Sequence, residues 1–291
     1  MIAQLFEIIA PVLISAGLGF GWGRLGWAYD ERVISRLIMM VGAPCLVFSS
    51  FLSYELPLAA LGQVMLAALT ATAGFAVIGA AVLKAARLPL SLFLPPLMFV
   101  NAGNIGLPLC LFAFGERGLA IAVGYFVVAA TLQYTVGAWI YSGHALPTAG
   151  LKTPLPYAAA LSAVLLVLGV KPPGWILDTA QLIGGLTIPL MLITLGVSLA
   201  RLGVTKPPRS VALGALRIGM GLGVGLAVAE LFGLSGVVRG VVVLEASMPA
   251  AVFNYLLATH YGRGREEAAS LAVVSTLIAF AALPFILLLV L

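Results

Sequence analysis

Residues 101–108 have the sequence NAGNIGLP and interrupt an apolar stretch over 92–115. That stretch is long enough for a membrane-spanning helix, which needs about 20 apolar residues. Pro108 removes a backbone hydrogen bond and clashes with the preceding turn, and the glycines loosen the backbone further. Backbone groups freed by such a break must find partners in protein or in a watery cavity, because lipid offers none. The sequence therefore predicts a broken membrane helix that lines a cavity.

The composition of the whole chain also predicts a membrane protein. Of 291 residues, 62% are hydrophobic and 9% are charged, and the mean hydropathy is +1.16. Soluble domains are about half apolar and about a quarter charged. The net charge of +5 comes without the basic tract that would indicate a nucleic-acid partner. Cys45 and Cys110 lie in apolar stretches, where they indicate packing rather than a disulfide or a metal site.

Ten apolar stretches predict an all-α integral membrane fold with ten transmembrane helices. The first lacks a basic leader, so we expect a spanning helix rather than a signal peptide. Cytoplasmic loops carry an excess of Lys and Arg. With the N-terminus outside, alternate connections hold 12 of the 15 basic residues, so both termini are predicted to be extracytoplasmic in a multi-pass protein of the inner (plasma) membrane. The predicted spans are 2–23, 33–53, 58–83, 92–115, 118–142, 154–170, 176–200, 209–231, 237–258 and 267–290. The twelve residues are Arg24, Arg32, Arg36, Lys84, Arg87, Lys152, Arg201, Lys206, Arg209, Arg217, Arg263 and Arg265.

Two pairs of prolines predict an internal repeat. Pro44 and Pro189 are 145 residues apart, and Pro108 and Pro249 are 141 apart. Prolines are common in membrane helices, which explains single prolines better than matched pairs. A five-helix unit is odd, so its second copy would enter the membrane inverted, as in many secondary transporters with a site where broken helices meet. We expect repeats over residues 1–145 and 150–291.

The second broken stretch, residues 245–254, has the sequence EASMPAAVFN. Glu245 is the only carboxylate expected deep within a span, and such a group is a functional hypothesis by default. It lies four residues before Pro249, as Asn104 lies four before Pro108, so the two side chains are predicted to face one cavity. The alternatives are a neutral buried acid or a pair with Arg239 or Arg217.

The polar groups of both stretches form the predicted site. Freed carbonyls are typical ligands of a cation, and half-helix N-termini are typical of an anion site. For the asparagines the alternative role is hydrogen bonding between helices. The substrate-binding candidates are Asn101, Asn104, Pro108, Pro249 and Asn254. The ion-coupling candidates are Glu245, Asn104, Ser247 and Met248, with Glu245 as the candidate ligand of a sodium ion and no other cofactor expected. Lesser candidates are Gln133, Tyr134, Thr194 and Ser198.

Several motifs resemble the auxin efflux carrier family of membrane transporters, which is related to the bile-acid:sodium symporters. They are NAGNIGLPL at 101–109, FGERG at 114–118, PLML at 189–192, LGVSLA at 195–200 and ASMP at 246–249. The resemblance implies a scaffold of spans 1, 2, 6 and 7, a transport domain of spans 3–5 and 8–10, and helices 4 and 9 that cross at Pro108 and Pro249. It also implies an elevator-type movement, and a homodimer through the scaffold helices is a further expectation.

The predicted function is secondary active transport of a small organic anion, a carboxylate or an auxin-like acid. The resemblance implies small carboxylates such as malonate and malate, and the string EASM resembles the glutamate region of the sodium-coupled relatives. Sodium coupling through Glu245 is preferred. A proton-coupled or uncoupled carrier and a channel remain alternatives, since a desolvated carboxylate titrates easily. An enzyme is not expected, because the two histidines, His144 and His260, are predicted near the surface with no paired nucleophile.

Overall fold

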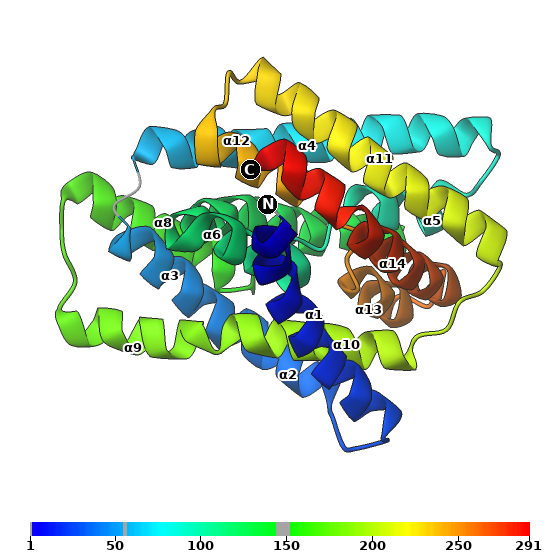
Figure 1. Ribbon diagram of the computed structural model, residues 1–291, viewed down its shortest axis with the longest axis horizontal. Coiled ribbons are helices and arrows are strands. Elements are labelled where there is room, and N and C mark those ends of the chain that lie inside the picture. Colours follow the sequence, from blue (N-terminus) through cyan, green and yellow to red (C-terminus); the bar gives the residue numbers. More distant parts are fainter. Residues whose placement is uncertain (1, 55–56, 144–151) are drawn as a thin grey trace.

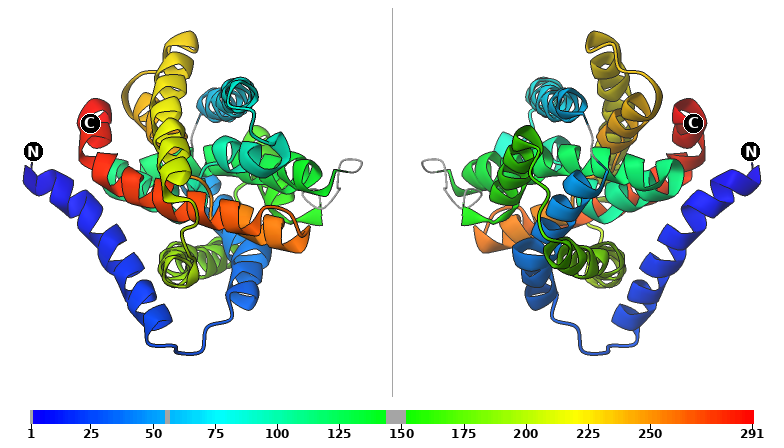
Figure 2. Two further views of the ribbon diagram at one scale, coloured as in Figure 1. Left: turned by 90° about the vertical axis from the view of Figure 1, so that its right-hand side faces the viewer. Right: turned by 90° about the vertical axis from the view of Figure 1, so that its left-hand side faces the viewer.

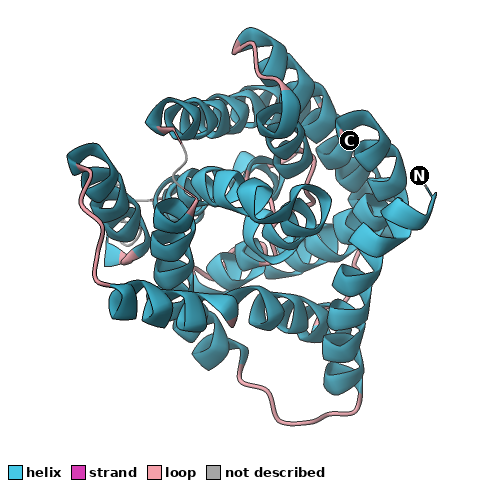
Figure 3. Cartoon of the chain, turned by 60° about the vertical axis from the view of Figure 1, so that its left-hand side comes forward, coloured by secondary structure: helices cyan, strands magenta, loops and turns pink. Residues whose placement is uncertain are grey.

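The computed structural model describes residues 2–54, 57–143 and 152–291, and these ranges are helical with loops between the helices (Figures 1 and 3). His144 and the predicted boundary between the repeats lie outside the described residues. One isolated β-bridge, between Val100 and Ala250, is the only strand-like pairing in the described ranges.

Helix occupies each of the ten predicted ranges. In chain order the elements, of which the η elements are π-helical turns, are α1 (Ile2–Arg24), α2 (Glu31–Leu37), η1 (Ile38–Gly42), α3 (Ala43–Ser53), α4 (Leu58–Ala85), α5 (Leu90–Met98), η2 (Ala102–Gly106), α6 (Leu107–Leu132), η3 (Gln133–Gly137), α7 (Ala138–Ser142), α8 (Leu155–Leu168), α9 (Gly174–Gly185), α10 (Thr187–Arg201), α11 (Pro207–Leu231), α12 (Gly236–Ala246), α13 (Phe253–His260) and α14 (Arg265–Val290).

Seven helical stretches of the described chain are long and apolar enough to cross a membrane. One of them, Ala102–Ser142, has 41 residues, which at 1.5 Å per residue is about 60 Å, twice the thickness of the hydrocarbon core. Gly115 interrupts it with φ +66° and ψ −165°, a conformation open to glycine but not to residues with a side chain. The motif at 114–118 is therefore a turn between two helices rather than part of one.

The outer surface is strongly apolar. Large side chains such as Phe6, Trp175 and Leu182 are more than 70% exposed, and many others are at least half exposed. A soluble monomer rarely exposes apolar surface on this scale. The all-helical, apolar exterior is that of a multi-pass membrane protein.

Two groups of helices pack together. In the first, α1, α2 and η1 contact α10 while α3 contacts α8 and α9. In the second, α4, α5, α6, α11, α12 and α14 contact one another, η2 and η3 contact α6, and α13 contacts α14. The contact of α1 with α10 depends on glycine, because a Cβ on Gly196 would lie 1.9 Å from the Ala16 carbonyl oxygen. Helix α1 runs along the edge of the molecule, and its start lies on the same flank as the end of α14 (Figure 2).

Candidate functional site

The two helix breaks meet at a crossover in the protein interior. The chain leaves helical geometry between α5 and η2, and again between α12 and α13. There the Asn101 N–H donates to the Pro249 carbonyl at 2.8 Å, and the Ala251 N–H donates to the Phe99 carbonyl at 3.0 Å. Each break thus satisfies backbone groups that the other frees, which a lipid environment requires.

The two broken helices were predicted to cross at Pro108 and Pro249. The prediction is wrong for Pro108, which lies away from the crossing point. The chains cross at Val100 and Ala250. Pro108 is the second residue of α6, where a helix tolerates the missing N–H, whereas Pro249 lies within the unwound stretch. The break before η2 follows Pro95 and Pro96 at the end of α5. A proline thus marks a broken helix without locating the break.

A pocket of about 80 Å³ lies beside the crossover and is lined by both groups of helices. The second group contributes Asn101, Asn104 and Gln133, and the first contributes α2, η1 and α10. Pro108, Pro249 and Asn254 do not line the pocket. Its hydroxyl-bearing residues are Ser35, Tyr134, Thr194 and Ser198.

Two helix N-termini reach this pocket. Residues 102–104 begin η2 and the helix that continues into α6, and residues 251–253 lead into α13. The first N–H groups of a helix lack intrahelical partners and carry partial positive charge, so a helix N-terminus attracts an anion. Among the described residues that line the pocket none is Lys or Arg. The one charged side chain in that lining is Glu31, which is bonded to Ser198 and Arg201, so attraction for an anion has to come from the backbone N–H groups.

Side-chain amides complete the pocket. The Nδ2 of Asn101 is buried and has no hydrogen-bond partner among the described residues. Gln133 donates through Nε2 to the Asn254 Oδ1 at 3.2 Å, and Asn254 donates through Nδ2 to the Phe99 carbonyl at 3.4 Å. Asn254 is fully buried behind the pocket and orients Gln133. Buried polar groups need a hydrogen-bond partner. A hydrogen-bond acceptor bound in the pocket would provide one for the Asn101 amide.

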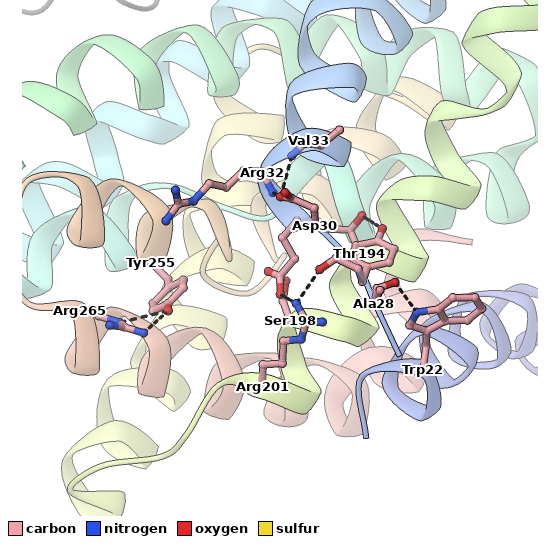
Figure 4. Close-up of polar contacts among 12 residues, drawn as sticks. Trp22, Ala28, Asp30, Arg32, Val33, Thr194, Ser198, Arg201, Tyr255 and Arg265 are labelled. Atoms are coloured by element: carbon pink, nitrogen blue, oxygen red, sulfur yellow. Dashed lines mark hydrogen bonds and ion pairs between the residues drawn. The ribbon is translucent and has the colours of Figure 1, made fainter. Parts of the chain in front are cut away.

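The pocket adjoins a vestibule of about 1080 Å³, with which it shares lining residues such as Ser35 and Phe253. Figure 4 shows several residues that line the vestibule, Asp30, Arg32, Arg201, Tyr255 and Arg265. Arginine dominates the charged lining of the vestibule, with Asp30 and Glu31 as the acidic residues. The four arginines outnumber the two acidic residues, and an excess of positive charge along a cleft steers anions toward it. The basic lining residues are Arg32, Arg36, Arg201 and Arg265, together with His260.

Glu31 lies where the pocket meets the vestibule and joins α2 to α10. Ser198 donates to Glu31 at 2.8 Å, and Arg201 pairs with it at 3.0 Å. Next to it the hydroxyls of Tyr29 and Thr194 lie 2.6 Å apart, and burial is the main cause that raises the pKa of Tyr29 above its ordinary value. Glu31 is not among the site residues predicted from the sequence. The signal that could have singled it out is the adjacent helix cap, in which Asp30 accepts from the backbone N–H groups of Arg32 and Val33.

Glu245 is separate from the pocket. It is fully buried, the Cys110 thiol donates to its Oε1 at 3.8 Å, and its Oε2 has no partner in the described part of the chain. The predicted shared cavity with Asn104 is therefore wrong, because the break precedes Asn104 on one helix but follows Glu245 on the other. The predicted pairings with Arg239 or Arg217 are wrong too, since both arginines donate to backbone carbonyls.

Arg217 is not a residue of a cytoplasmic connection, as the charge pattern predicts, but a fully buried side chain of α11. Its Nη1 donates to the Leu97 carbonyl at 2.9 Å and its Nε to the Met248 carbonyl at 3.2 Å, and its Nη2 donates to the Ala246 carbonyl. The guanidinium also stacks 4.1 Å from the centre of the Phe75 ring. These carbonyls lie at the C-terminal ends of α5 and α12, where helix dipoles are negative.

The other predicted ion ligands also have partners. The Ser247 hydroxyl donates to the Val243 carbonyl at 2.7 Å, and the Met248 carbonyl accepts from Arg217. The crossover thus has two electrostatic sides. Helix N-termini meet at the pocket, and helix C-termini meet at Arg217.

Comparison with known proteins agrees with this architecture. Residues 142–287, just over half of the chain, match the family model described as membrane transport protein. Over 184 residues the chain is 28% identical to a protein of Methanocaldococcus jannaschii named "Uncharacterized transporter MJ1031". That alignment covers 56% of each protein, so the chain spans little more than half the length of this relative. The chain therefore belongs to the membrane transport protein family, the auxin efflux carrier family of membrane transporters.

Proposed function

We propose that this protein is a secondary active transporter of a small organic anion, which binds in the pocket beside the crossover. One observation carries the proposal. Two helix N-termini and the unpartnered Asn101 amide converge on one pocket. Such a pocket binds a carboxylate through backbone N–H groups without a fixed salt bridge, so release does not require breaking an ion pair.

The size of the pocket favours a small substrate. At about 80 Å³ it is well below the range of about 300–1,000 Å³ typical of drug-sized ligands. Malonate or malate suits this volume better than an aromatic auxin-like acid. The arginines of the vestibule would concentrate such anions at its mouth.

The position of the pocket supports the proposal of an elevator-type mechanism. Its lining is divided between the two packed groups of helices, with Thr194 and Ser198 on one side and Asn101 and Gln133 on the other. Movement of one group against the other would carry the ligand across the membrane. The groups correspond to a scaffold of α1–α3 and α8–α10 and a transport domain of α4–α7 and α11–α14. We propose ten spans in two inverted repeats, an arrangement that the turn at Gly115 supports because it divides the 41-residue stretch Ala102–Ser142 into two helices.

The vestibule indicates which side is open. Its four arginines belong to connections predicted to be cytoplasmic. We therefore propose that this is the inward-facing state of the carrier, with both termini on the outer side.

Coupling is proposed at Glu245. An unpaired buried carboxylate is costly, so this group needs a proton or a cation. Sodium coupling stays a prediction that the observed contacts disfavour, because two neighbouring carbonyls, those of Ala246 and Met248, already bind Arg217. A proton requires no such ligands, so these contacts favour proton coupling.

Counterflow of radiolabelled malate in proteoliposomes tests the proposal. We expect saturable exchange that malonate inhibits and that a pH gradient drives more strongly than a sodium gradient. Gln133→Leu should abolish exchange, whereas Gln181→Leu, an exposed glutamine bonded to Ser53 away from the pocket, should retain it. Absence of counterflow for every carboxylate tested would refute an organic-anion carrier, and single-channel currents would identify a channel instead.

A further inference from the structure

The C-terminal ends of the two broken helices face a charge that substrate binding does not use. Arg217 is fully buried, and no described residue forms an ion pair with it. Burying a charge without compensation is costly. Here the compensation comes from three carbonyl oxygens and one aromatic ring.

The fold is built to bring this arginine to the crossover. A Cβ on Gly221 would lie 2.4 Å from the Ala246 carbonyl oxygen, and one on Gly225 would lie 2.9 Å from the Ala246 Cβ. These two glycines let α11 pack directly on the end of α12. Gly219 and Gly223, on the other face of α11, have nothing within 4 Å of a Cβ. The close approach is therefore specific to the face next to Arg217.

The bonded carbonyls come from both broken helices, that of Leu97 from one and those of Ala246 and Met248 from the other. Unwound carbonyls and half-helix C-terminal ends are the groups with which secondary transporters coordinate a cation. A planar guanidinium presents five donors in a fixed fork and stays charged. It can hold all three carbonyls at once.

We propose that the Arg217 guanidinium is a built-in cation of the crossover, which takes the place of a dissolved ion at the Leu97, Ala246 and Met248 carbonyls and fixes the two broken helices to each other. Arg217 is then a positioning residue, since it acts on the pocket through the helices whose N-termini line it. The consequence for transport rests on the proposed carrier function: movement of the substrate requires no sodium at these carbonyls.

Ion-dependent thermal stability of the purified protein tests the inference without any substrate. Arg217→Ala vacates the carbonyls, so millimolar sodium or guanidinium should raise its melting temperature by about 4 °C at tenfold excess over Kd, and choline should not. Wild type and the control Arg239→Ala, whose partly exposed guanidinium donates to the Leu289 carbonyl away from the crossover, should show no such response. Arg217→Lys, which keeps a positive charge, should be more stable than Arg217→Ala in ion-free buffer.

A melting temperature of Arg217→Ala that equals that of wild type, or that responds no more to sodium or guanidinium than to choline, would overturn the proposal. If Arg217→Ala folds only when one of these cations is present, that result supports it. If neither Arg217→Ala nor Arg217→Lys folds under any ion condition, the proposal fails, because a cation role requires that another cation substitutes. These melting experiments contain no malate, so their result does not depend on the proposed transport function. A failure of malate counterflow would count against that function and not against the role of Arg217.

Discussion

Gly106 leaves room for the Glu245 carboxyl, and replacing it by alanine makes a defined perturbation. A Cβ at position 106 would lie 2.2 Å from Oε2, 2.5 Å from Cδ and 2.6 Å from Oε1 of Glu245. Close carbon–oxygen contacts in proteins are about 3.3–3.6 Å. The carboxyl must therefore move by about 1 Å, in a site where it is fully buried.

The expected cost is that of overpacking a well-filled interior, about 1–3 kcal/mol. For a protein of this size that corresponds to a fall in melting temperature of about 2–4 °C for each kcal/mol. Glu245→Asp shortens the side chain by one methylene and withdraws the carboxyl from the new methyl group. The double variant Gly106→Ala/Glu245→Asp should therefore be more stable than the sum of the two single changes predicts, by about 1 kcal/mol.

Melting curves of the four proteins in detergent measure this coupling. Glu245→Gln is the matched control, because it keeps the length of the side chain and should not relieve Gly106→Ala. If the changes at positions 106 and 245 are additive, or if Glu245→Gln relieves the methyl group as well as Glu245→Asp does, the placement of Glu245 against Gly106 is refuted.

Three further predictions concern the crossover and the turn in α6. Gly221→Val should push α11 away from the Ala246 carbonyl and displace Arg217. Malate counterflow should therefore fall well below that of the control Gly223→Val, whose side chain meets open space. Equal rates in the two variants would contradict the close packing. Asn101→Ala should weaken malate binding about 10- to 100-fold, the loss expected for a hydrogen bond to a charged group. Its melting temperature should change little, because the Asn101 Nδ2 has no protein partner in the described chain. Calorimetric titration measures the affinity, and unchanged binding would count against the pocket. Gly115→Ala should destabilise the protein by about 1–3 kcal/mol, because φ +66° with ψ −165° is a conformation that residues with a side chain rarely adopt. Gly17→Ala, in a helix with nothing within 4 Å of a Cβ, should melt at or slightly above the temperature of wild type.

Hydropathy located the helices because membrane helices need long apolar runs, and each of the ten predicted ranges contains helix. Seven helical stretches of the described chain are long and apolar enough to span a membrane, so the count of ten stays a prediction. It could not place the breaks. Pro108 lies inside a helix and Pro249 in an unwound stretch, since a proline early in a helix is tolerated. The geometry of the crossover depends on pairing between segments 150 residues apart, Val100 with Ala250, which local sequence does not encode.

The residues of the candidate site could be predicted only in part, because their positions also depend on contacts between segments far apart in the sequence. Asn101 and Asn104, predicted substrate-binding residues, line the pocket, while Asn254 lies behind it and bonds to Gln133, and substrate binding by these residues stays a prediction. Arg217 was assigned to a cytoplasmic loop because the count of Lys and Arg residues considers only how near each residue lies to the end of a span. Nothing in the sequence shows that carbonyls of two other helices surround it. A buried arginine becomes recognisable only with its tertiary partners in place.

The central claim is that an anion binds between the two helix N-termini of the crossover. Protection of a single cysteine tests it most directly: Ser35→Cys in a Cys45→Ala background places a thiol at the pocket wall, and Cys110 is fully buried. We predict that malate slows alkylation of this thiol several-fold and that uncharged dimethyl malate does not. Alkylation of Thr259→Cys, which lines the vestibule but not the pocket, should be unaffected by either compound. Equal alkylation rates of Ser35→Cys with and without malate, or equal protection by malate and its dimethyl ester, would contradict an anion site in this pocket.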